Sequence, residues 1–225
     1  MAKKLLIILL LFLVLCGCTA SEPNDKHLVS LMGIEGDGAE VALYCKYTDL
    51  SDNSSVRSVG GRGKNIGEAL GDINLFLNKI PSLSHCEMIV FSKNTEKTLF
   101  FETIYFCRKN ELPLKLKLAA TEDIKPLFSE ENPLSGVDLS GMVQLAFSAH
   151  GFGGHTSLYE IETAINLGKG FALPYFVREG ESFKLEGLGL YKNCDFIRKI
   201  GISESRDYAR DNNISGEKNF DGRGQ

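Results

Sequence analysis

The sequence lacks the short motifs that mark many enzymes and nucleotide-binding proteins. It has no G-x-S-x-G segment of the serine-hydrolase type and no H-E-x-x-H segment of the zinc proteases. Gly61 and Gly63 begin a G-x-G-x-x-G pattern, but Ile66 takes the place of the third glycine. Lys64 is followed by Asn65 rather than by Ser or Thr, so a phosphate-binding loop is not supported. A glycine turn into a helix is the favoured interpretation.

Closely spaced cysteine pairs are also missing. The sequence has six cysteines and no C-x-x-C pair, so neither a disulfide framework nor a zinc site is supported. Two cysteines lie in the N-terminal segment discussed below. We expect the other four to be buried thiols: Cys45, Cys86, Cys107 and Cys194. One disulfide among them is the alternative.

The four histidines show no metal-ligand spacing. His150 and His155 flank a glycine-rich segment, where an ordinary exposed loop is favoured over a metal site. His85 precedes Cys86, but adjacent residues of an extended chain point to opposite faces and would not share a catalytic site. His27 stands alone. We therefore expect no metal, no cofactor and no enzymatic activity.

Long apolar runs and basic clusters are absent beyond the N-terminus. No later segment approaches the roughly 20 apolar residues that a membrane-spanning helix needs. The formal net charge is −4, and no basic patch is interleaved with aromatic residues. This charge balance argues against a general nucleic-acid-binding protein.

The N-terminus has the pattern of a bacterial lipoprotein signal. Lys3 and Lys4 precede an apolar segment over residues 5–15, and the sequence Leu-Cys-Gly-Cys follows at residues 15–18. Cleavage before Cys18 would remove a signal peptide of residues 1–17 and leave a thiol for lipid attachment. Cys16 fits less well, because bulky Leu15 would precede it. An ordinary secretory signal or an uncleaved anchor is the alternative. Residues 18–26 would form a polar tether.

A central amphipathic helix follows the glycines. Its apolar residues recur at spacings of three and four. Asn65 can cap its N-terminus, with Glu68 completing a capping box, and Pro81 ends it. An apolar strand over residues 88–91 comes next. The predicted helix face consists of Ile66, Ala69, Leu70, Ile73, Leu77 and Ile80.

The remaining elements alternate between strands and helices, which predicts an α+β fold with mixed sheets and packed helices. We expect two small α/β subdomains over residues 27–130 and 136–203, separated by a polar segment, and a disordered tail over 204–225. Expected strands cover residues 28–34, 41–47, 114–118, 171–178, 182–192 and 196–202. Expected helices cover residues 95–110, 139–149 and 159–167, with a short one ending at Phe128.

These segments resemble, in order, the Ger(x)C spore germination lipoproteins. The resemblance covers roughly residues 28–212. Its matching residues are Gly33-Ile34, Gly61, Gly63, Ile66, Glu68, Ala69, Leu70, Ser84, His85, residues 88–91, Ala119, Ala120, Ile124, Leu127, residues 187–192 and 200–202.

The resemblance implies a non-enzymatic C subunit of a nutrient germinant receptor. Such a subunit would be anchored on the outer face of the spore inner membrane and would work with integral-membrane A and B subunits. The family continues with a third domain, whereas this sequence ends soon after residues 205–208. Because of this difference, the protein could be a diverged or a shortened member of the family.

Two other function classes remain as alternatives. One is a cell-envelope or solute-binding lipoprotein unrelated to germination, although two-lobed solute-binding proteins usually need a longer chain. The other is an exported enzyme, which a bound metal or a hydrolase screen would reveal. Adjacent genes for A and B subunits would favour the receptor subunit.

Overall fold

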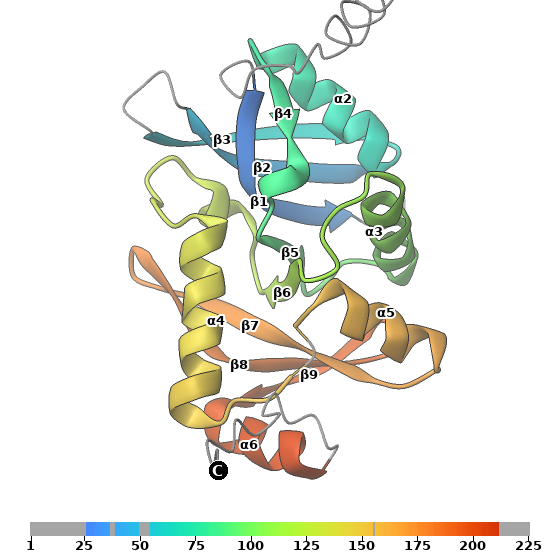
Figure 1. The fold of residues 1–225 in the computed structure, drawn as a ribbon, viewed down its shortest axis with the longest axis vertical. Coiled ribbons are helices and arrows are strands. Elements are labelled where there is room, and N and C mark those ends of the chain that lie inside the picture. The colour runs from blue at the N-terminus through green and yellow to red at the C-terminus, as the bar shows by residue number, and fades with distance from the viewer. Residues whose placement is uncertain (1–25, 37–38, 50–54, 155, 212–225) are drawn as a thin grey trace, which may run out of the picture.

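The computed structural model describes residues 26–36, 39–49, 55–154 and 156–211. Within these residues nine strands form one mixed sheet, in the order β3-β2-β1-β5-β6-β7-β8-β9, with β4 also beside β1 (Figure 1). The strands are β1 (Lys26–Gly36), β2 (Val41–Asp49), β3 (Ser55–Gly63), β4 (Ile80–Ser82), β5 (Met88–Ser92), β6 (Lys117–Thr121), β7 (Phe171–Glu179), β8 (Ser182–Lys192) and β9 (Asp195–Gly201).

The helices lie on both sides of this sheet. They are α2 (Ile66–Phe76), α3 (Lys97–Lys109), α4 (Gly136–His150), α5 (Leu158–Asn166) and α6 (Ile202–Asp211), with short 3₁₀ helices η2 (Leu83–His85) and η3 (Lys125–Phe128). The predicted class, strands with packed helices, is confirmed.

The strands of the two expected subdomains join into one sheet rather than two. Parallel strands β1, β5, β6 and β7 form the centre, and antiparallel strands extend it on either side. The join is narrow, because β6 and β7 pair only at Ala120 with Tyr175 and at Thr121 with Phe176. The sequence carried no signal for so short a pairing. The division into residues 27–130 and 136–203 stays a prediction.

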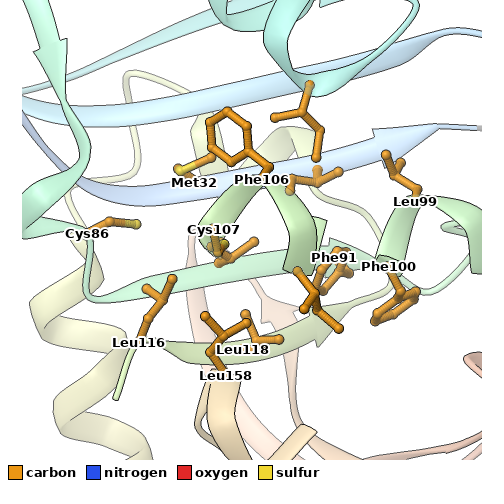
Figure 2. Packing of buried hydrophobic residues seen from close by; sticks show 14 of the residues in the cluster. Met32, Cys86, Phe91, Leu99, Phe100, Phe106, Cys107, Leu116, Leu118 and Leu158 are labelled. Carbon is orange, nitrogen blue, oxygen red and sulfur yellow. The ribbon is translucent and has the colours of Figure 1, made fainter. Parts of the chain in front are cut away.

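One face of the sheet, here called the α3 face, is covered by α2, α3 and α5. Phe100 of α3 stacks on Phe91 of β5, with ring centroids 4.2 Å apart, and meets Tyr191 of β8 edge-on at 5.4 Å. Figure 2 shows α3 placing Leu99, Phe100 and Cys107 against the strands of this core. The α3 face therefore joins residues from both halves of the chain in a single apolar cluster.

The opposite face, here called the α4 face, is covered by η3 and α4, with α6 beside β8 and β9. Leu139 and Val143 of α4 pack near Leu31 and Val90 of the central strands. Further along the helix, Ala146 packs in a cluster with residues of β7, β8 and β9. Helix α4 thus runs from the N-terminal strands to the C-terminal ones (Figure 1).

The start of α4 lies directly on strand β1. A Cβ atom at Gly136 would fall 1.8 Å from the carbonyl oxygen of Ser30, and the Gly136 N–H donates to the Ser30 hydroxyl at 3.3 Å. Only glycine permits this approach. Ser135 caps the helix with Asp138 in a complete capping box.

Helix α2 has the predicted N-terminal cap but a shorter length. The Asn65 side chain accepts a hydrogen bond from the Glu68 N–H at 2.9 Å, whereas the Glu68 carboxylate turns to the N–H of Lys64. The capping box is therefore only half formed. The helix ends at Phe76, because the chain becomes extended at Leu77 and then pairs β4 with β1. The assignment of Ile80 to the buried helix face is wrong, since Ile80 is 71% exposed.

The glycines before α2 belong to strand β3 rather than to a turn. A Cβ at Gly61 would lie 2.5 Å from the carbonyl oxygen of Ala69, and one at Gly63 would lie 2.5 Å from the Ala69 nitrogen. Their lack of side chains lets α2 lie against the sheet edge.

Two further expectations need correction. The alternation around Leu114 and Leu116 is not a strand, since β6 begins only at Lys117. The expected disorder is wrong for residues 204–211, which belong to α6, where buried Ser205 donates to the Gly201 carbonyl at 2.7 Å. Residues 212–225 lie outside the described residues.

Candidate functional site

The predicted lipidation residue, Cys18, lies outside the described residues, as do the signal peptide and residues 18–25 of the tether. Its acylation stays a prediction. None of the helices in the described ranges has the length and apolar character needed to cross a bilayer. The described chain begins with Lys26 at the start of β1.

The histidines do not come together. Buried His27 bonds through Nε2 to Asn78 Oδ1 at 2.9 Å, and its ring lies 4.4 Å from that of Tyr47. His85 is exposed in η2. His155 and the side chain of His150 are outside the described part. Among the described residues, no three His, Cys, Asp or Glu side chains are grouped as a metal would require.

All four described cysteines are free thiols buried in the protein. Burial raises the pKa of Cys45 and of Cys107 to about 12, and that of Cys194 to about 11. The Cys86 thiol donates to the Met88 carbonyl at 3.4 Å, and burial raises its pKa well above the usual value. At neutral pH these groups stay protonated, which makes them poor nucleophiles and poor metal ligands.

A buried lysine is the polar group that the sequence reasoning missed. Lys46 on β2 is fully buried on the α4 face, and its ammonium donates to the carbonyls of Asn132 and of Leu134, the latter at 3.0 Å. Burial lowers the Lys46 pKa to about 8, and the charge of Asp138 opposes that shift. Lys46 thereby fixes the segment that leads into α4.

A second lysine reaches α4 itself. Lys117 of β6 donates from Nζ to the carbonyl oxygen of Ser140 at 3.1 Å and also to its hydroxyl. Burial lowers the Lys117 pKa. The alternation of side chains along β2 and β6 could have indicated both lysines, because each stands at a position that points toward the α4 face. Their partners are α4 and the loop before it, so we assign them a structural role.

Exposed apolar side chains gather at the end of α2. Leu75 is 82% exposed, Phe76 69% and Ile80 71%. Ile80 pairs with Lys26, the first described residue of β1. Figure 1 shows the end of α2, the start of β4 and the start of β1 at the same end of the molecule. We call Leu75, Phe76, Lys79, Ile80 and Lys26 the α2–β4 rim.

A second exposed surface lies over α3 and α5. Arg108 of α3 and Glu162 of α5 form a two-pronged ion pair, with Nε–Oε1 and Nη2–Oε2 distances of 3.2 and 2.5 Å. Exposed Tyr105 and Tyr159 each lie three residues, about one helical turn, before a member of this pair. Tyrosine and arginine are enriched at protein–protein interfaces. We call these four residues the α3–α5 surface.

Comparison with known protein families gives one match that spans most of the chain. The model described as the spore germination protein N-terminal domain matches residues 19–178, from directly after Cys18 to the last residue but one of β7. The chain belongs to this family. The resemblance seen in the sequence is thus confirmed at the family level. No curated protein matches the chain.

Among solved structures, the chain is similar to the one titled "Crystal Structure of the GerBC protein". The two share 14% sequence identity with a TM-score of 0.43, over 79% of this chain and 54% of that chain. This chain therefore spans about half the length of the solved protein it matches.

Proposed function

We propose that the protein is a lipid-anchored subunit of a spore germinant receptor that supports nutrient-triggered germination through protein–protein contacts. It is held through Cys18 on the outer face of the spore inner membrane, beside integral-membrane A and B subunits. The family match carries this proposal: it begins at residue 19, directly after Cys18, which would be the lipid-bearing first residue of the mature chain. The proposed role requires no catalysis or cofactor.

The main test is deletion of the gene in a sporulating host that has the matching A and B subunits and no redundant receptor. Nutrient-triggered germination should slow, whereas germination by a non-nutrient route that bypasses the receptors should continue. Unchanged nutrient germination would favour the alternative, an envelope lipoprotein with another role.

The anchor has its own test. Wild-type protein should incorporate labelled fatty acid, and Cys18→Ala should remain unprocessed and unlabelled. Cys16→Ala is the matched control and should behave as wild type. Processing and labelling of Cys18→Ala at wild-type levels would show that the anchor is elsewhere.

The α3–α5 surface is our choice for the partner contact, because it combines exposed tyrosines with an Arg–Glu ion pair. Tyr105→Ala should weaken copurification with the A and B subunits. Leu145→Ala, at an exposed position of α4, is the control and should copurify normally. Equal recovery of both variants would exclude Tyr105 from the contact.

A further inference from the structure

The α2–β4 rim is unusual because three exposed large apolar side chains lie beside two half-buried lysines, Lys26 and Lys79. Leu75, Phe76 and Ile80 each keep more than two thirds of their surface in solvent. No Asp or Glu occurs between Asp72 and Glu87, whereas Lys79 lies inside this segment. Pairing of β1 with β4 adds Lys26 beside Ile80. The rim is therefore cationic and apolar in a protein whose formal net charge is −4.

The rim also lies where the lipid anchor would join the domain. If Cys18 is acylated as proposed above, eight residue steps separate the bilayer from Lys26. Even a fully extended chain of that length reaches at most about 30 Å. Lys26 is itself part of the rim, so the rim is held within this distance of the bilayer surface.

We propose that the α2–β4 rim contacts the membrane and orients the domain on it, with the apolar side chains among the headgroups and the lysines beside anionic lipid. This inference rests on the proposed lipid anchor. Apolar side chains flanked by lysine are the combination that interfacial membrane contacts use. The diacylglycerol expected on Cys18 would by itself hold the protein on the membrane, so the rim contact would set the orientation of the domain rather than its attachment.

A second copy of the chain fits the rim less well than a membrane surface does. Stable protein–protein interfaces bury about 800 Å² on each partner, from about 20 residues or more. Three exposed apolar residues with two lysines make a much smaller surface. The lysines would also face each other across a symmetric contact, and like charges repel.

Tryptophan fluorescence tests the contact directly, because the sequence contains no tryptophan. Phe76→Trp places a single indole on the rim. Leu145→Trp places one at a comparably exposed position on α4, 66% exposed against 69% for Phe76. Each full-length variant is produced with labelled fatty acid and reconstituted into phosphatidylethanolamine vesicles with about a quarter phosphatidylglycerol, with and without brominated acyl chains.

Brominated lipid should reduce the tryptophan fluorescence of Phe76→Trp about twofold and leave that of Leu145→Trp nearly unchanged. Adding Lys79→Gln to Phe76→Trp should reduce the quenching, as should vesicles without phosphatidylglycerol. Melting temperatures near that of wild type would show that the exposed substitutions leave the fold intact.

Three results would overturn the proposal. Labelled protein whose Phe76→Trp indole is quenched no more than that of Leu145→Trp would show that the rim stays in water. A blue-shifted but unquenched Phe76→Trp indole would show that a second copy of the chain covers it. Absence of labelled fatty acid would contradict the anchor itself, and the membrane contact with it.

Discussion

On the α3 face of the sheet the buried contacts of the helices are mainly apolar and aromatic, whereas on the α4 face buried lysines add hydrogen bonds. Phe91, Phe100 and Tyr191 form a continuous aromatic contact on the first face. On the second, Lys46 and Lys117 donate hydrogen bonds to the backbone of α4 or of the loop before it. Apolar burial is non-directional, whereas hydrogen bonds to particular carbonyls fix where a segment starts.

The two mechanisms predict different responses to mutation. The α3 face should depend mainly on volume and apolarity. The α4 face should depend in addition on the ionisation of Lys46 and on the close approach of Gly136 to β1. Four substitutions test this difference, from the largest expected effect to the smallest.

Ile73→Asp should have the largest effect. Ile73 of α2 is fully buried on the α3 face, and a carboxylate there would have no partner. We expect a loss of several kcal/mol, comparable with the whole stability of a typical domain. Asn74→Asp, at the exposed neighbouring position, should be nearly neutral. Urea denaturation measures both, and equal midpoints would refute the register of α2.

Gly136→Ala should weaken the contact between the start of α4 and strand β1. Its Cβ would overlap the Ser30 carbonyl oxygen, so the helix start must shift, at a cost of about 2–4 kcal/mol. Gly141→Ala lies in the same helix with no heavy atom within 4 Å, and should stabilise by about 0.5–1 kcal/mol. Denaturation at one pH gives both values. Similar effects of the two substitutions would mean that α4 does not rest on β1.

Lys46 should make the α4 face respond to pH. Its pKa is about 8 in the folded protein and about 10.4 when unfolded, so between these values the unfolded chain binds more protons. The stability contributed by Lys46 therefore rises with pH across this window, by about 3 kcal/mol, and is constant below it. Lys46→Met should lack this rise.

The measurement is the difference in unfolding free energy between wild type and Lys46→Met at pH 7, 8, 9 and 10. Subtraction removes the titration of other groups, including the thiols, whose raised pKa values work in the opposite direction above pH 9. A difference that stays constant over this range would show that Lys46 is not desolvated in the folded state.

Arg108→Ala should have the smallest effect. Its ion pair with Glu162 joins α3 and α5 at the surface, where Arg108 is 45% exposed, and exposed pairs contribute about 0–1 kcal/mol. Arg62→Ala, which breaks the more exposed pair with Glu40, should change stability still less. A loss above about 2 kcal/mol for Arg108→Ala would show that the α3 face also depends on polar contacts.

The sequence predicted the elements whose own residues show a pattern. The spacing of Ile66, Ala69 and Ile73 gave the buried face of α2, and all three are fully buried. The apolar run at residues 88–91 gave β5, which is buried on both sides as a central parallel strand should be.

Features set by distant contacts could not be predicted in this way. Strand β3 is rich in glycine and lacks apolar alternation, because α2 requires the space that side chains would fill. Pairing with β1 converts the segment after Leu77 into β4, against the helical spacing of Ile80. The role of Lys46 depends on carbonyls 86 and 88 residues away in the chain. The predicted lipid site, Cys18, is outside the described residues.

Helix α4 has a consequence for how the protein opens. It begins on β1 and ends in the cluster formed with β7, β8 and β9, so it bridges the narrow β6–β7 pairing. Bending at that pairing would break contacts at one end of the helix. We therefore expect backbone amides of β1 and β8 to exchange with deuterium in a single cooperative opening rather than in two independent ones.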